Sequence, residues 1–283
     1  MPVPAWLLKK MPDYASFAET EKILAGVSTV CVKAACPNMP ECFSRKQATF
    51  LILGDRCTRN CAFCHIRQAL PLPPDDREPE RVAEAAARLR LAHLVITSVT
   101  RDDLGDGGAA HFARTVNAVK QAGKSFIEVL LPDFRGSREA LDLVAAAGPD
   151  IIAHNLETVL RLHPRVRPGA CYARSLRVLR EAKALGFLTK SGVMLGLGET
   201  DEEVRVALSN LREAGCDIVT LGQYRQPGPA QPPPLRYVME EGFAALREAA
   251  RELGFRQVLA GSYVRSSYRA GEIRELPEAK RGG

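Results

Sequence analysis

The sequence predicts an α/β protein built on a partial (β/α)6-type TIM barrel, with an extension at each end. Three observations predict this fold: short apolar runs alternate with helical patterns, glycines follow the helical patterns, and polar side chains follow the apolar runs. Strands that alternate with helices of about ten to fifteen residues are typical of βαβ units and a parallel sheet. A doubly wound sheet of the Rossmann type is the main alternative, because periodicity alone does not determine whether a sheet closes.

The expected strands are short runs rich in β-branched or other apolar residues. In chain order they are Thr49–Gly54, Leu94–Val99, Phe126–Leu131, Asp150–Ala153, Val193–Leu197, Ile218–Gly222 and Val258–Ala260. The expected helices are Ala15–Leu24, Glu80–Leu91, Gly108–Ala122, Arg138–Ala146, Ala173–Leu185, Asp201–Ala214 and Glu240–Leu253. Acidic residues at 201–203 favour a helix start there, because they lie at the positive end of the helix dipole. A glycine after most of the helical patterns is expected of a helix C-terminus.

The order of these elements predicts three segments. Residues 1–47 form an N-terminal extension that includes an irregular, Cys-bearing loop at Lys33–Arg45, and residues 48–262 form the barrel. Residues 263–283 form a C-terminal segment, and its polar tail is expected to be disordered. Residues 225–236 form a Pro-rich loop. Polar side chains at the strand ends mark the rim where such barrels carry their sites. They are Asp55, Ser98, Asp133, His154, Asn155 and Gln223.

Composition narrows the classes of partner. The 283 residues include 39 Lys and Arg against 33 Asp and Glu, a net charge of +6. This mild excess suits an acidic protein partner and does not indicate nucleic-acid binding. No apolar run is long enough to span a membrane, and the N-terminus has neither a signal-peptide nor a transit-peptide pattern. We therefore expect a cytoplasmic protein with no nucleic-acid and no membrane partner.

Six of the eight cysteines lie between Cys31 and Cys64. Disulfides rarely persist in the cytoplasm, so this clustering points to metal binding. The spacing of Cys57, Cys61 and Cys64 allows three thiolates to turn toward one centre, as in iron–sulfur proteins. Three ligands on a [4Fe–4S] cluster leave one iron open to bind a substrate. A structural zinc with His65 as the fourth ligand is an alternative, and so are free or disulfide-linked cysteines.

Another triplet lies nearer the N-terminus and is called the first triplet: Cys31, Cys36 and Cys42, with spacings of four and five residues. Two neighbouring sets of three thiolates favour two clusters over one site with six ligands. A structural zinc in this triplet is the alternative, and the residues alone do not decide between them. The two remaining cysteines, Cys171 and Cys216, are expected to be ordinary thiols.

The triplet Cys57, Cys61 and Cys64, with Phe63 before its last cysteine, resembles the motif of the radical S-adenosylmethionine (SAM) superfamily. The two triplets in succession resemble the lipoyl synthase family, and the resemblance covers roughly residues 5–275. The other matching segments are Val99–Gly108, Leu131–Phe134, His154–Thr158, Thr189–Gly192, Gly196–Glu199, Gly222–Tyr224 and Arg265–Tyr268. The chain departs from the family's pattern at residues 152–153 and at residues 225–236. The second departure puts substrate docking at the Pro-rich loop in doubt.

The resemblance implies two [4Fe–4S] clusters with different roles. One cluster, with the ligands Cys57, Cys61 and Cys64, binds SAM and reductively cleaves it to a 5′-deoxyadenosyl radical. The auxiliary cluster gives up its own sulfur, and its ligands are Cys31, Cys36, Cys42 and Ser267. The implied reaction is insertion of two sulfur atoms at carbons C6 and C8 of an octanoyl-lysine. Rival functions are another sulfur-inserting radical SAM enzyme, such as biotin synthase or a tRNA methylthiotransferase, and a zinc-stabilised binding module.

The resemblance also implies partners. The octanoyl chain is carried by the lipoyl domains of 2-oxo-acid dehydrogenase (E2) components or by the glycine-cleavage H protein. Electrons come from a reduced ferredoxin or a flavodoxin-type donor.

Five further residues are candidates for SAM contacts. Asn155 and Glu157 follow a predicted strand and suit the ribose hydroxyls and the amino group, although Glu157 could instead cap the next helix. Arg174 suits the methionine carboxylate, because a guanidinium fork matches a carboxylate, although it could instead be a solvated helix charge. Asp102 lies in a loop expected to close over the cofactor, and Phe63 lies within the cysteine motif.

Overall fold

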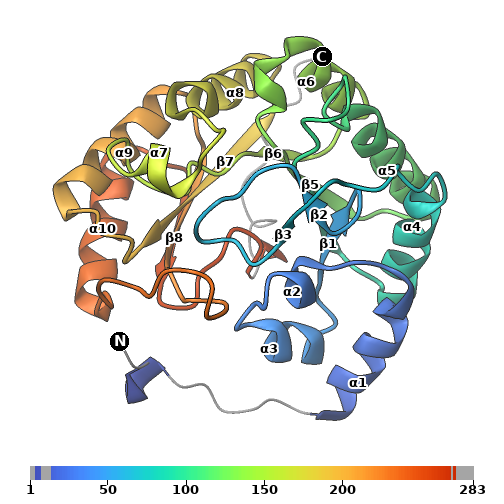
Figure 1. Ribbon diagram of the computed structural model, residues 1–283, viewed down its shortest axis with the longest axis horizontal. Coiled ribbons are helices and arrows are strands. Elements are labelled where there is room, and N and C mark those ends of the chain that lie inside the picture. Colours follow the sequence, from blue (N-terminus) through green and yellow to red (C-terminus); the bar gives the residue numbers. More distant parts are fainter. Residues whose placement is uncertain (1–3, 8–13, 269, 272–283) are drawn as a thin grey trace. The chain divides into compact units, whose positions relative to one another are not determined.

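The computed structural model describes residues 4–7, 14–268 and 270–271 (Figure 1). The chain divides into two compact units. The N-terminal unit contains residues 2–59 and 64–150, and the C-terminal unit contains residues 60–63 and 151–283. Every predicted strand and helix is present, with bounds that shift by a few residues. None of the helices in the described residues combines the length and the apolar content that a membrane span requires.

The N-terminal unit has three parallel strands in the order β1, β4, β5. Their bounds are Thr49–Ile52, His93–Ser98 and Phe126–Leu130. The register pairs Thr49 with Val95 and His93 with Phe126. All four residues of β1 are buried, which is typical of a parallel strand covered on both faces. The helices that alternate with these strands are α4 (Glu78–Leu89), α5 (Ala109–Ala122) and α6 (Arg138–Ala146), and α5 packs against both of the others.

The segment predicted as an irregular Cys-bearing loop, Lys33–Arg45, contains the helix α3 (Met39–Ser44), so that prediction is wrong for its second half. The helix α2 (Val30–Lys33) precedes this segment and ends at its first residue. Helix α2 begins because the hydroxyl of Thr29 accepts a hydrogen bond from the amide of Val32 at 3.3 Å. Helix α3 has a proline in its first turn, where the missing N–H has no intrahelical role. The hydroxyl of Thr20, in α1 (Tyr14–Ile23), donates to Phe43 O at 2.7 Å and attaches α3 to α1.

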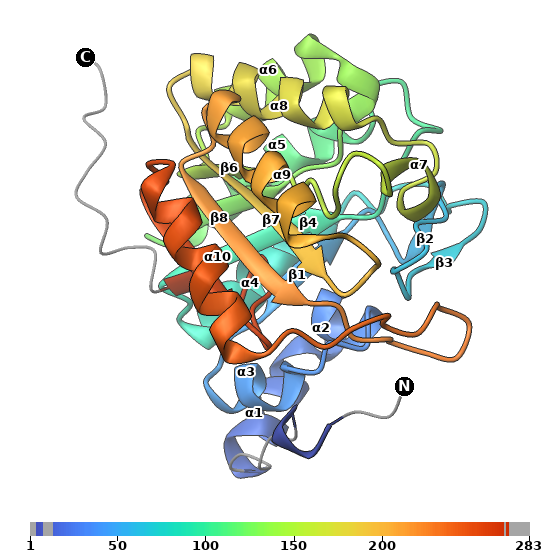
Figure 2. The ribbon, with the colours of Figure 1, turned by 90° about the vertical axis from the view of Figure 1, so that its left-hand side faces the viewer.

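The remaining elements of this unit are short. Strands β2 (Arg56–Cys57) and β3 (Arg67–Gln68) pair in parallel, and Figure 2 shows them side by side. The 3₁₀ helices of the described part are η1 (Ala5–Leu7), η2 (Leu24–Gly26) and η3 (Phe134–Gly136).

The C-terminal unit has four parallel strands in the order β6, β7, β8, β9. Their bounds are Ile151–Ala153, Leu188–Leu195, Ile218–Gln223 and Gln257–Gly261. The helices are α7 (His163–Val166), α8 (Tyr172–Ala184), α9 (Asp201–Glu213) and α10 (Glu240–Glu252). Helix α10 packs against β9 and α9, and Figure 2 shows where α9 and α10 lie. Apolar residues of these strands and helices form one buried cluster, which includes Leu195, Leu208, Leu221 and Phe243.

The acidic start predicted for α9 is a capping box. The hydroxyl of Thr200 accepts from Glu203 N at 3.2 Å, and the Glu203 carboxylate accepts from Thr200 N at 2.9 Å. Hydrogen bonds from Arg161, then from this amide, lower the pKa of Glu203 to about 2. The N-terminus of α9 therefore keeps its carboxylate charged at neutral pH.

The segment boundaries predicted after residues 47 and 262 stay a prediction. The two compact units divide the chain elsewhere, and the predicted disordered tail lies outside the described residues.

Candidate active site

Cys57 and Cys64 belong to the N-terminal unit, and both sulfurs accept backbone hydrogen bonds. Cys57 is in β2, and its Sγ accepts from Arg59 N at 3.4 Å. The Sγ of Cys64 accepts from Ile66 N, also at 3.4 Å. Backbone N–H groups aimed at sulfur stabilise thiolates and adjust the reduction potential of iron–sulfur clusters. The local backbone therefore suits both cysteines as cluster ligands.

Cys61 belongs to the C-terminal unit, together with Phe63. The amide of Ala62, between them, donates to Val166 O at 2.9 Å. Phe63 packs against the buried cluster of this unit. This packing gives Phe63 a structural role, and its predicted cofactor contact stays a prediction.

Arg59, which lies between the first two cysteines of the motif, is buried and paired with two carboxylates. Its guanidinium binds Asp102 with two hydrogen bonds, of 2.7 and 2.8 Å, and binds Asp133 at 2.7 Å. Burial alone would lower the pKa of Arg59, but the hydrogen bonds that it donates to Asp102 and Asp133 outweigh burial and raise that pKa. The charged side chain of Arg59 thus attaches the cysteine loop, residues 57–64, to the segments that follow β4 and β5.

Thr58, the residue before Arg59, also attaches the cysteine loop to the segment after β4. Thr58 N and the Thr58 hydroxyl donate to Thr100 O at 3.1 and 3.0 Å.

The segment after β4 is itself held by ion pairs. Arg101, which is buried, pairs with Asp103 at 2.8 Å and donates to Leu53 O at 3.3 Å. Asp102 also pairs with Arg135 at 3.3 Å. The structure therefore places Asp102 in the support of the cysteine loop, and a contact from Asp102 to SAM stays a prediction.

The first triplet lies on the two short helices of the N-terminal unit. Cys31 is buried in α2, whereas Cys36 and Cys42 are half-buried, with Cys42 in α3. Burial, and to a lesser degree the neighbouring Cys36, raises the pKa of the Cys31 thiol to about 12. The amide of Cys36 donates to Cys31 O at 3.1 Å, which brings the first two cysteines together. A metal or cluster would have to displace the proton of Cys31 to bind it.

All eight cysteines are free thiols in the structure. In the part of the chain that the structure describes, no three His, Cys, Asp or Glu side chains are gathered closely enough to hold a metal ion. The donor chemistry still fits iron–sulfur clusters, since each triplet supplies three thiols and two of the sulfurs accept backbone N–H groups.

The predicted SAM contacts Asn155 and Glu157 lie together in the C-terminal unit. The Asn155 amide donates to the Glu157 carboxylate at 3.0 Å. Arg167 donates to Asn155 O at 2.8 Å and to the Ser175 hydroxyl at 3.3 Å, and so supports the segment after β6. Burial raises the pKa of Glu157, while Arg167, Asn155 and Arg265 oppose that rise. Glu157 has a positive φ of 69°, so its backbone is held in an uncommon conformation at this site.

The Arg265–Tyr268 segment lies against the strands of the same unit because two glycines leave room for it. The Ser266 hydroxyl donates to Asn155 Oδ1 at 2.8 Å. A Cβ on Gly192, in β7, would lie 2.8 Å from the Ser266 hydroxyl. A Cβ on Gly222, in β8, would lie 2.1 Å from Val264 O. The serine next to the predicted cluster ligand Ser267 is thus hydrogen-bonded to a predicted SAM contact.

Replacing Gly222 with alanine is expected to displace Val264 and with it the serine segment. The added Cβ meets a backbone oxygen, which cannot rotate away, so we expect a destabilisation of about 1–3 kcal/mol, measured by urea unfolding. Gly261, the register partner of Gly222 in β9, is the matched control, because its nearest neighbour to an added Cβ is 3.6 Å away. Equal losses of stability in Gly222→Ala and Gly261→Ala would contradict this account.

Arg174 lies in α8 and is half-buried. Its predicted pairing with the methionine carboxylate stays a prediction.

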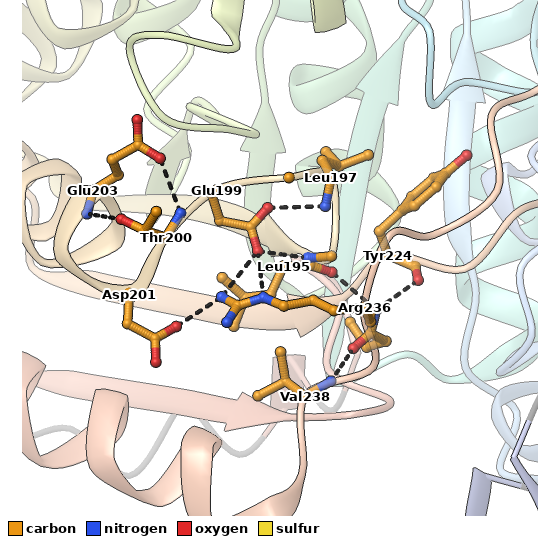
Figure 3. Close-up of polar contacts among 12 residues, drawn as sticks. Leu195, Leu197, Glu199, Thr200, Asp201, Glu203, Tyr224, Arg236 and Val238 are labelled. Carbon is orange, nitrogen blue, oxygen red and sulfur yellow. Dashed lines mark hydrogen bonds and ion pairs between the residues drawn. The ribbon is translucent and has the colours of Figure 1, made fainter. Parts of the chain in front are cut away.

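The Pro-rich loop 225–236 has no helix or strand, as predicted, and both of its ends are fixed (Figure 3). The buried side chain of Gln223 donates to Arg236 O at 2.9 Å and accepts from Val238 N at 2.8 Å. The Arg236 guanidinium pairs with Glu199 at 3.2 Å and with Asp201 at 2.7 Å. Gln223, which the sequence placed at the rim, therefore anchors this loop.

Sequence reasoning missed two arginines that organise the site, Arg59 and Arg167. Arg59 occupies a spacer position of the cysteine motif, and Arg167 lies in a loop outside every predicted element. The sequence holds a partial signal, because Asp133 follows a predicted strand. That Asp133 is buried, and therefore requires a compensating charge, is known only from the structure. The sequence does not indicate which cationic side chain compensates the charge of Asp133.

Comparisons with known proteins identify the family. The sequence pattern of the Radical SAM superfamily matches residues 51–211. The lipoyl synthase of Nitratidesulfovibrio vulgaris is 52% identical over 271 residues, covering 95% of this chain and 91% of that protein. The lipoyl synthase of Caldanaerobacter subterraneus is 52% identical over 246 residues, covering 86% of this chain and 87% of that protein.

Solved structures support the fold. Streptococcus suis SuiB bound to S-adenosylmethionine has a TM-score of 0.61 at 10% identity, covering 79% of this chain and 54% of that one. Methylornithine synthase (PylB) has a TM-score of 0.50 at 16% identity, covering 94% of this chain and 88% of that one. At these identities the likeness concerns the fold alone, and it confirms the predicted partial-barrel fold class. The chain belongs to the lipoyl synthase family of the radical SAM superfamily.

Proposed function

We propose that this chain inserts two sulfur atoms at carbons C6 and C8 of an octanoyl-lysine carried by another protein. The observation that carries the proposal is the presence of two separate cysteine triplets in a chain about half identical to lipoyl synthases over nearly its whole length. The proposed carriers are the lipoyl domains of 2-oxo-acid dehydrogenase (E2) components and the glycine-cleavage H protein. The net charge of +6 supports an acidic carrier.

Family membership brings SAM and two [4Fe–4S] clusters as the cofactors. When bound, the clusters supply an electron for SAM cleavage and the sulfur for insertion. We assign Cys57, Cys61 and Cys64 to the cluster that binds SAM. We assign Cys31, Cys36, Cys42 and Ser267 to the auxiliary cluster. The hydrogen bonds from Arg59 N to Cys57 and from Ile66 N to Cys64 support the first assignment.

The residues of the C-terminal unit have a positioning role in this proposal. Asn155 holds the Glu157 carboxylate through its amide and accepts from Ser266 through its oxygen, so one side chain orients both groups. Arg167 balances the charge of Glu157 and supports the backbone of Asn155. Arg174 pairs with the methionine carboxylate of SAM. Because Asn155 contacts both Glu157 and Ser266, SAM binding and the serine segment share one hydrogen-bond network.

The test is anaerobic reconstitution with iron and sulfide, followed by turnover with SAM, dithionite and an octanoylated lysine peptide. The expected product is a peptide that has gained two sulfur atoms, detected by mass spectrometry, with formation of 5′-deoxyadenosine. Ser267→Ala should still cleave SAM but lose sulfur insertion. Ser266→Ala, its neighbour, should instead weaken SAM binding, because Asn155 loses a partner. SAM cleavage without sulfur insertion by the unaltered chain would refute the proposal.

A further inference from the structure

Six and eight residues after Cys64, the chain presents two leucines to solvent. Leu70 is 83% exposed and Leu72 is 63% exposed, and Leu70 is the most exposed large apolar side chain among the described residues. Single exposed leucines are common on protein surfaces, but two within three residues form a small apolar surface that gains free energy when a partner covers it. We refer to residues 69–74 as the Leu-Pro segment.

The sequence of the Leu-Pro segment restricts its backbone before any partner binds. Leu70 precedes Pro71, and Leu72 precedes Pro73 and Pro74. A residue before proline is confined to extended conformations, and proline fixes its own φ. The two leucines are therefore presented with little backbone freedom, so a partner that covers them loses little conformational entropy on binding.

The Leu-Pro segment is close to two predicted ligands of the SAM-binding cluster. It is hydrogen-bonded to Cys57, and it follows strand β3, which begins three residues after Cys64. Ala69 N donates to Cys57 O at 3.2 Å, and β3 pairs with the strand that contains Cys57. Between Cys64 and β3, Ile66 N donates to the Cys64 sulfur at 3.4 Å. A protein bound to Leu70 and Leu72 would thus contact a segment that is hydrogen-bonded to Cys57 and close in sequence to Cys64.

Two arginines flank this apolar surface. Arg56 is in β2 and donates to Leu70 O at 3.5 Å, and Arg67 is exposed in β3. Neither forms a salt bridge in the described part of the chain. The acidic residues that follow the Leu-Pro segment are paired, Asp75 with Arg81 at 2.8 Å and Asp76 with Arg114 at 3.0 Å. The surface is therefore apolar with a positive rim, which suits a partner with an acidic rim.

We propose that Leu70, Leu72, Arg56 and Arg67 form the docking surface for an acidic protein that donates single electrons. This proposal rests on the proposed function, which requires an electron for each SAM cleaved. In each transfer the donor would lose one electron, and the [4Fe–4S] cluster assigned to Cys57, Cys61 and Cys64 would gain it, with no atom transferred.

The position of the surface favours an electron donor over an octanoylated carrier. Electron transfer slows steeply with distance, so a donor must bind close to the cluster ligands. A carrier presents its octanoyl group on a long lysine arm, so its folded domain can bind elsewhere and still deliver the substrate.

The test uses the reconstituted enzyme and two acidic donors, a reduced flavodoxin and a reduced 2[4Fe–4S] ferredoxin. Leu70→Ser/Leu72→Ser is expected to raise the Kd for the donor about ten-fold or more, measured by anaerobic titration, and to slow cluster reduction in stopped-flow measurements. Reduction by dithionite, a small reductant that needs no docking surface, should stay within about two-fold of the unaltered enzyme. Leu143→Ser, at a 42% exposed position in α6, is the matched control and should change neither quantity.

Charge is tested separately. Arg67→Glu is expected to lower the association rate and to flatten its dependence on salt, because steering by opposite charges is screened by ions. Arg88→Glu, at an exposed position in α4, is its control.

The proposal is overturned if neither donor binds the unaltered enzyme, or if the leucine variant binds and is reduced like the Leu143 control. It is also overturned if the variant keeps donor binding but loses affinity for an octanoylated carrier, because the surface would then belong to the carrier. Failure of dithionite-driven SAM cleavage in the unaltered enzyme would count against the proposed function instead, and donor binding would still decide the docking surface.

Discussion

Replacing Cys36 with alanine is expected to reduce sulfur insertion to below about one-hundredth of its original rate while SAM cleavage stays within about two-fold. The reason is that Cys36 and the SAM-binding cysteines lie on separate segments with separate supports. Cys36 follows α2, whereas Cys57 is held by β2 and by Arg59 N. Removing one thiol from the first segment leaves the hydrogen bonds of the second intact.

The measurement for Cys36→Ala compares 5′-deoxyadenosine with lipoylated product in the same reaction. Cys171→Ala is the matched control, because Cys171 is an exposed thiol outside both triplets, and both products should stay unchanged. Cys61→Ala should lose both products. If Cys36→Ala still formed lipoylated product at a rate near that of the Cys171 variant, the assignment of the first triplet as the sulfur source would be wrong.

Replacing Arg59 with methionine is expected to lower the free energy of unfolding by about 3–5 kcal/mol. The substitution removes the ion pair between Arg59 and the fully buried carboxylate of Asp133, and it removes the two hydrogen bonds to Asp102. Removing one partner of a buried ion pair is costly because the other charge stays in a medium that solvates it poorly. The cysteine loop would also lose its main side-chain attachment, so iron content should fall with stability.

Lys33→Met is the matched control for Arg59→Met. Lys33 pairs with Asp55 at 2.7 Å, but both side chains are partly exposed, and such pairs contribute at most about 1 kcal/mol. Urea unfolding of the two variants compares a buried with an exposed ion pair in the same unit. In a double variant, Asp133→Asn should recover part of the loss, because the buried side chain that lost Arg59 then carries no charge. Equal losses in the Arg59 and Lys33 variants would show that the buried network does not stabilise the loop.

The strands were predictable where burial and apolar character coincide, and less so where they do not. After Thr49, strand β1 is a continuous apolar run, and the strand begins at the predicted residue. Strand β7 begins at Leu188, five residues before its predicted start. The prediction missed its first half because Thr189, Lys190 and Ser191 are polar. These polar residues are buried, and Thr189 is hydrogen-bonded to the Asp217 carboxylate through its amide at 3.0 Å. Asp217, which is distant in sequence, therefore allows this polar stretch to lie in a buried strand.

The candidate site shows the same limit. The cysteine ligands were visible because their spacing is local and chemically specific. The role of Arg59 was not visible, because its partners Asp102 and Asp133 lie 43 and 74 residues further along the chain. The requirement for glycine at position 222 likewise comes from Val264, which only the folded chain brings near β8. Sequence spacing therefore predicted the metal chemistry, whereas the supports of the site required the structure.

The most direct test of two independent clusters is metal analysis with Mössbauer spectroscopy of the anaerobically reconstituted chain. The unaltered chain should hold about eight irons in two [4Fe–4S] clusters, and a variant with alanine at Cys31, Cys36 and Cys42 should keep about four. About four irons in the unaltered chain, or zinc in place of iron in the first triplet, would contradict the account.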